Sequence, residues 1–211
     1  MRTVPVKLFV PYIKPLAEKC PDYIIESEVA RTVGDICRKT GCLTTTAEVK
    51  TQAGRCEYML NSPEGLEVDM VRHCYVDGME IPAQTFDNGS QAYGGDWRNT
   101  SGKPLCYTFR HRNHLTLIPV PDREYSVRAD VTSFIAPDSE LIPDMFLTAY
   151  LDTVVNGALA RIHQLAGQTF ASAELAVLYE QRYAVGLNQI KIDATRDFTR
   201  TSGRVHFNRI I

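Results

Sequence analysis

Residues 144–195 read DMFLTAYLDTVVNGALARIHQLAGQTFASAELAVLYEQRYAVGLNQIKIDAT, and this stretch decides the fold of the last third of the chain. Apolar residues recur in it at three- and four-residue spacing, which predicts helices with a wide apolar face. Gly167 predicts the end of the first helix, and Ser172 is a suitable N-cap for a second helix that continues to about Thr195. Gly157 lets another helix approach the first one closely. The stretch therefore predicts two packed helices.

A further helix is predicted near the N-terminus. Pro21 and Asp22 open it, apolar residues follow at helical spacing, and Thr40-Gly41 ends it, because glycine readily adopts the left-handed conformation of a helix C-cap. Before it, the prolines within Phe9–Lys19 favour an extended segment or a very short helix. With the two later helices, this one predicts a bundle of about three helices.

The residues between these helical regions have the composition of strands. Asp77-Gly78 is the clearest hairpin signal, because Asp-Gly readily supplies the positive φ angles of a tight turn. We expect three antiparallel pairs, each formed by sequence neighbours: Thr44–Thr51 with Cys56–Leu60, Val68–Val76 with Met79–Thr85, and Leu105–Ile118 with Glu124–Phe134.

The predicted fold class is therefore α+β. A helical bundle domain (1–41 and 137–195) contains an inserted antiparallel β domain (42–136), and an extended C-terminal arm (196–211) follows.

A long glycine- and asparagine-rich loop from Asp87 to about Gly102 interrupts the β region and holds the single tryptophan of the chain. Loops of this length in a compact domain are usually functional or mobile. Its tryptophan either packs back on its own sheet or is presented to a partner, where aromatic side chains contribute strongly to binding. The sequence leaves both readings open, and the candidate partner-facing residues are Tyr93, Trp97 and Arg98.

The C-terminal arm sets apolar side chains among regularly spaced arginines. If the last helix continued, these arginines would form a solvated cationic stripe, and the arm could also be an idle tail. Its alternating end, RVHFNRII (204–211), instead has the pattern of a strand that can add to a partner's sheet edge, which favours a docking arm. The candidate docking residues are Arg196, Phe198, Arg200, Arg204, Val205, Phe207, Arg209, Ile210 and Ile211.

Composition excludes several classes of protein. The 211-residue chain has a formal net charge of −2, so it is not a globally basic nucleic-acid binder. Its six cysteines include no CxxC pair and no zinc-finger spacing, which predicts free thiols in a reducing cytoplasm. No secretory signal and no apolar run of about 20 residues is present, so a soluble product is expected.

Catalytic and cofactor motifs are also missing from the sequence. It contains no GxSxG, HExxH, phosphate-binding GxxxxGKS or GxGxxG pattern. His111 and His114 have suitable ligand atoms, but on a single strand they would point to opposite faces, so no metal site is predicted. We expect a protein that is not an enzyme and that needs no cofactor.

The order of these elements resembles the head-to-tail adaptor, or connector, proteins of tailed bacteriophages, above all the short-tailed ones. The resemblance covers nearly the whole chain, although its motifs concern packing rather than chemistry. It departs at Phe170, where the family more often has tryptophan. The matching segments are VPYIKPLAEKCPDYIIESEVARTVGDICRKTG (10–41), YVDGMEIPA (75–83), SGKPLCYT (101–108), LTLIPVPD (115–122), and the stretch from Ile142 to Arg196 with its Gly157–Arg161 motif GALAR, Ala176, Tyr179 and Tyr183.

The resemblance implies a structural virion protein at the head–tail junction. Members of the family form a homo-oligomeric ring, usually of about twelve copies, beneath the portal protein. The ring extends the channel for double-stranded DNA, without sequence-specific binding, and presents its lower face to the tail (nozzle) protein. The resemblance also implies that the C-terminal segments reach the portal, which would then be the partner of the predicted docking arm.

Two other classes of function stay open at this point. A neck or tail-completion protein of a long-tailed phage would have a related role but would dock differently. An unrelated β-domain binding module or enzyme would need a pocket, and it would be indicated if Trp97 and Tyr93 lined a concave site with convergent polar groups.

Overall fold

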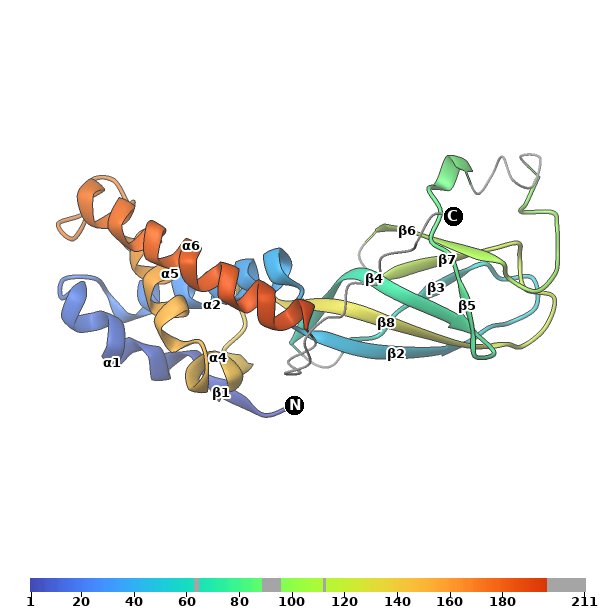
Figure 1. Cartoon of the computed structure of the whole chain (residues 1–211), viewed down its shortest axis with the longest axis horizontal. Helices are drawn as coiled ribbons and strands as arrows, with labels where there is room; N and C mark the ends of the chain where they lie inside the picture. The colour runs from blue at the N-terminus through green and yellow to red at the C-terminus, as the bar shows by residue number, and fades with distance from the viewer. Residues whose placement is uncertain (63–64, 89–95, 112, 197–211) are drawn as a thin grey trace, which may run out of the picture.

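Figure 1 shows helices at one end of the molecule and β-sheets at the other in a computed structural model, which describes residues 1–62, 65–88, 96–111 and 113–196. The chain crosses between the two parts where α2 (Asp22–Thr40) leads into β2 (Thr44–Lys50), and it returns after β8 (Ser126–Ile135). The predicted α+β fold class is confirmed.

Three long helices dominate the helical part: α2, α5 and α6. Helix α5 packs against both of the others. The expectation of about three helices is incomplete, because short helical turns accompany the long helices. The short turns are η1 (Val6–Phe9), α1 (Val10–Ile13), η2 (Lys14–Leu16) and α4 (Met145–Thr148). The long helices α5 and α6 span Leu151–His163 and Ala173–Thr195.

Local sequence signals set the helix ends. Gly41 adopts the left-handed conformation at the C-cap of α2 (φ 61°), and the Ser172 hydroxyl accepts the backbone N–H of Leu175 at the start of α6. The predicted single helix from residue 144 to 166 is wrong, because Tyr150 leaves the helical conformation (φ −126°, ψ 24°) between α4 and α5. At this break the Tyr150 hydroxyl donates to Asp193 Oδ2 of α6 (3.2 Å).

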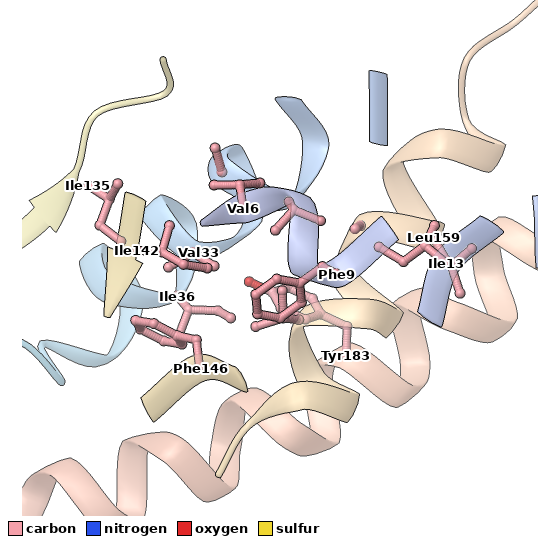
Figure 2. Packing of buried hydrophobic residues seen from close by; sticks show 14 of the residues in the cluster. Val6, Phe9, Ile13, Val33, Ile36, Ile135, Ile142, Phe146, Leu159 and Tyr183 are labelled. Atoms are coloured by element: carbon pink, nitrogen blue, oxygen red, sulfur yellow. The ribbon is translucent and has the colours of Figure 1, made fainter. Parts of the chain in front are cut away.

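The N-terminal turns complete the core of the helical part. Figure 2 shows Phe9 and Ile13 beside Leu159 and Tyr183, and all four side chains are buried. A two-stranded antiparallel sheet of β1 (Thr3–Pro5) and β9 (Leu141–Pro143) ties this segment to the chain that returns from the β part. The other labelled core residues are Val6, Val33, Ile36, Ile135, Ile142 and Phe146.

The β part is a sandwich of two antiparallel sheets. One sheet has the strand order β2-β8-β4-β5 and the other β3-β7-β6. Side chains from both sheets share one buried cluster, which includes Tyr58, Val68 and Leu115. The strands not yet defined are β3 (Glu57–Met59), β4 (Leu66–Val76), β5 (Met79–Ile81), β6 (Cys106–His111) and β7 (His114–Ile118).

Only one of the three predicted strand pairs forms. The β4–β5 hairpin turns at Asp77 (φ 49°) and Gly78 (φ 78°), as predicted. The pairing of β2 with β3 is wrong, because β2 pairs with β8 and β3 pairs with β7 in the other sheet. The run from Leu105 to Ile118 is also not one strand, since Asn113 (φ 65°) lets it fold back as the β6–β7 hairpin, which does not pair with β8.

Candidate functional site

Helix α6 carries apolar side chains on two opposite sides. Tyr179, Tyr183 and Ile190 are buried against the other helices. Leu178, Val185 and Ile192 point away from this core at seven-residue spacing, with 40%, 73% and 44% of their surface exposed. We call these three residues the outer α6 face. Aliphatic side chains exposed in a row on a folded subunit indicate a contact surface for another chain.

The inner side of α6 approaches its neighbours closely because glycines lie at the contacts. A Cβ on Gly157 of α5 would be 2.5 Å from Thr32 Cγ2 of α2 and 2.8 Å from Tyr183 Cδ2 of α6. A Cβ on Gly186 of α6 would collide with the side chain of Thr153. The sequence signal at Gly157 is thus confirmed, and it serves packing between helices within one subunit.

A polar contact fixes the same three helices at their junction. The Tyr183 hydroxyl of α6 donates to Asp35 Oδ2 of α2 at 2.9 Å. Lys39 of α2 and Arg161 of α5 form ion pairs with the same carboxylate at 2.8 Å and 3.3 Å. This contact holds α6, and therefore the outer α6 face, in a fixed orientation relative to α2.

The charge state of this contact follows from its partners. Burial alone would raise the pKa of Asp35, but hydrogen bonds from Lys39 and Tyr183, together with the charges of Lys39 and Arg161, lower it overall. Burial and the nearby Asp35 carboxylate raise the pKa of Tyr183. Asp35 is therefore ionised and Tyr183 is a neutral donor at neutral pH.

Trp97 packs back on its own sheets. Only 1% of its surface is exposed, and it forms a small buried cluster with Cys106, Ile118 and Val120. The Phe86 ring meets it edge-on, with 5.9 Å between ring centroids. Of the two readings of this residue, the structure shows the packed one, in which the indole lies against its own sheets. A contact between this loop and a tail protein stays a prediction.

Arg98 is the described candidate of this loop that faces solvent. Its guanidinium lies 4.6 Å from the Trp97 ring centroid and 5.3 Å from that of Phe86. Arg110 lies over the Phe86 ring at 4.2 Å, so two guanidinium groups lie against this half-buried ring. Tyr93 lies outside the described residues.

The docking arm begins where the described part of the chain ends. Arg196 is the C-cap residue of α6 and lies next to Ile192 on a shallow surface at the end of this helix. The arm therefore follows in sequence directly after the helix that carries the outer α6 face. The other candidate arm residues lie outside the described residues: Phe198, Arg200, Arg204, Val205, Phe207, Arg209, Ile210 and Ile211.

Metal-ligating side chains do not gather at one place in the described ranges. No cluster of three or more His, Cys, Asp or Glu side chains there could hold a metal ion. The prediction that His111 and His114 lie on one strand is wrong. They are backbone partners across the β6–β7 hairpin. All six cysteines are free, five of them buried, and burial raises the pKa of Cys74 to about 12, so its thiol is unreactive.

A family model described as SU10 adaptor protein matches residues 16–206. No curated protein matches the chain significantly. Among the described residues, no helix is both long and apolar enough to cross a membrane.

Proposed function

Because the chain belongs to the SU10 adaptor protein family of phage head-to-tail adaptors, we propose that it forms a ring that joins the portal to the tail and extends the DNA channel. The family match carries this proposal, since it spans both the helical part and the β part. The chain is a structural protein of the phage. The proposed ring has about twelve copies, and its place is the head–tail junction of the virion.

The helical part supplies the contacts between subunits in this proposal. It carries the outer α6 face, whose apolar side chains are exposed in the single subunit. The buried clusters of the β part lie between its own two sheets and beneath Trp97, so that part needs no neighbour to complete its core. The β part then points away from the ring contacts.

The C-terminal arm is proposed to bind the portal. Ordering a flexible segment costs about 1–2 kcal/mol per residue in backbone entropy, whereas exposed ion pairs contribute up to about 1 kcal/mol each. The four arginines of the arm cannot offset this cost for the whole segment. Apolar burial of Phe207, Ile210 and Ile211, or main-chain pairing with a sheet edge, must therefore supply most of the binding.

The loop from Asp87 to Ser101 is proposed to face the tail protein. Trp97 anchors this loop to the sandwich, and Arg98 presents a charged group next to the anchor. In this arrangement the tail protein contacts the arginine and the loop surface rather than the indole.

The near-neutral charge of the chain suits a DNA channel. Each phosphate contact adds salt-dependent affinity for DNA. A strongly basic lumen would hold the DNA and oppose its passage. A subunit with a net charge of −2 avoids this without any sequence-specific contact.

A mass measurement tests the proposal. We expect native mass spectrometry of the protein mixed with the portal of the same phage to show a complex with many copies of the 23.7 kDa chain per portal ring. Cryo-electron microscopy of that complex would place the β part away from the portal. A chain that binds tail-tube components but not the portal would instead be a neck or tail-completion protein of a long-tailed phage.

A further inference from the structure

An acidic groove lies on the side of α2 that faces away from α6. Its volume is about 690 Å³, and it is bordered by the N-terminal segment, α2 and the chain before β9. Glu26, Asp138 and Glu140 line it together with one cation, Lys7. Among the described residues, none of the three carboxylates forms an ion pair. The groove therefore offers unneutralised negative charge.

The same groove has apolar walls. Tyr23 and Leu141 line it, and both are largely exposed to solvent in the single subunit. Ala30 adds a small buried contact surface from α2. A fitting partner is thus cationic and carries an aliphatic side chain.

The C-terminal end of α6 has this chemistry. Ile192 is exposed there, and Lys191 beside it forms no ion pair with the part of the chain that the structure describes. Asn188, Thr195 and Arg196 complete the surface, which includes no acidic residue. We call the exposed surface formed by Lys191, Ile192 and Arg196 the α6 knob.

The groove and the knob lie on different sides of the helical part. Tyr183 of α6 contacts Asp35, so α6 packs on the Asp35 side of α2. Glu26 precedes Asp35 by nine residues, and at 3.6 residues per turn this places the two on opposite sides of the helix. A subunit therefore presents the knob in one direction and the groove in another, which is the arrangement that a head-to-tail ring contact requires.

We propose that the acidic groove receives the α6 knob of a neighbouring copy of this chain. The inference rests on the proposed ring and names the two surfaces that form its subunit contact. Ile192 would lie between Tyr23 and Leu141, and Lys191 would face the three carboxylates. A symmetric contact of two knobs would place like charges together and would close a dimer instead of a ring.

Site-directed cross-linking tests this contact. Ser27 lines the groove and is exposed, so Ser27→Cys and Ile192→Cys subunits are mixed, assembled with the portal of the same phage and oxidised. We expect a disulfide-linked dimer only in the mixture. Val177→Cys replaces Ile192→Cys as the matched control, because Val177 is also exposed on α6 but lies near its other end. The wild type reports any background from its own thiols.

A charge exchange adds a second readout. Lys191→Glu should prevent assembly at concentrations where the wild type assembles, and Glu26→Lys or Glu140→Lys in the same chain should restore it. These side chains are exposed or half-buried, so folding is expected to survive each change.

The outcomes separate this inference from the proposed function. If the rings bind the portal but the mixture gives no cross-link between positions 27 and 192, the groove contact is overturned and the adaptor role stays intact. The same holds if either variant alone gives as much cross-linked dimer as the mixture. A disulfide between two Ile192→Cys subunits, or a portal segment linked to position 27, also overturns it. A wild type that stays monomeric with the portal present overturns both.

Discussion

Replacing Tyr183 with phenylalanine should destabilise the helical part, and replacing Tyr179 with phenylalanine should not. The two tyrosines lie one turn apart on α6, and each has 8% of its surface exposed. The Tyr183 hydroxyl donates to Asp35. The Tyr179 ring stacks on His163 at 5.6 Å between centroids, and its hydroxyl forms no hydrogen bond with a described residue. The same chemical change therefore removes a hydrogen bond at only one of the two positions.

The stability loss expected for Tyr183→Phe follows from the geometry of this contact. A hydrogen bond to a charged group contributes about 1.5–3 kcal/mol to stability. The Asp35 side chain is 22% exposed and keeps its ion pairs with Lys39 and Arg161, so a loss near the lower end, about 1–2 kcal/mol, is expected. For a chain of this length that is a decrease in Tm of about 2–8 °C. Thermal and urea unfolding, followed by circular dichroism, measure it.

The difference in stability between the Tyr183→Phe and Tyr179→Phe variants should also depend on pH. The pKa of Asp35 is lowered in the folded state, so its contribution is fully present above its ordinary value of 3.8 and is lost as the pH falls through the folded value. Tyr183→Phe removes one of the bonds that lower this pKa, so its stability loss should be largest near neutral pH and should shrink in acid. Equal unfolding midpoints for the two variants at pH 7 would refute this account of the contact between α2 and α6.

Three further outcomes are expected. Gly157→Ala should lower the free energy of unfolding by about 1–3 kcal/mol through overpacking, and more than Gly34→Ala, whose new Cβ would meet a backbone oxygen at 3.0 Å; equal losses in urea unfolding would contradict this. Trp97→Ala should destabilise the sandwich by about 3–5 kcal/mol, while Arg98→Ala should cost only about 0.5–1 kcal/mol of stability, from its cation–π contacts, and should weaken tail attachment to filled heads; normal attachment of the arginine variant would remove Arg98 from the tail contact. Deletion of Val205–Ile211 should abolish portal binding more completely than any single arginine replacement. Surface plasmon resonance with immobilised portal measures this, and unchanged affinity of the deletion variant would mean that the arm is an idle tail.

Features set by a few adjacent residues were predictable from the sequence. The Gly41 C-cap, the Ser172 N-cap and the Asp77-Gly78 turn each depend on the conformational preferences of one or two residues. The close approach at Gly157 was also predictable, because only a residue without a side chain fits between two helices there.

Strand pairing was not predictable in the same way, because it depends on contacts far apart in the sequence. The partner of β2 is β8, about eighty residues later, and no local signal names it. One signal was present and was missed. Asn113 tolerates a positive φ, and in the structure its side-chain oxygen accepts the backbone N–H of Val68 while its carbonyl accepts that of Leu60. An asparagine in the middle of a long β-type run is such a turn signal.

The candidate site also depends on contacts that a local stretch of sequence does not specify. The sequence left the position of Trp97 open because burial depends on which strands lie beneath the loop, and here Cys106, Ile118 and Val120 lie there. The roles proposed for the C-terminal arm and for the loop surface depend on partner chains, and they stay predictions.

The outer α6 face shows why one chain alone does not define its own core. Leu178, Val185 and Ile192 have the helical spacing of core residues, and only their exposure in the folded subunit separates them from the buried Tyr183 and Ile190. A helix that is apolar on opposite sides normally lies inside a larger structure. In this subunit one side of α6 is covered by α2 and α5, and the other is not. The proposed ring would supply the missing cover, so the apolar pattern of α6 has to be read at the level of the assembly rather than of the single chain.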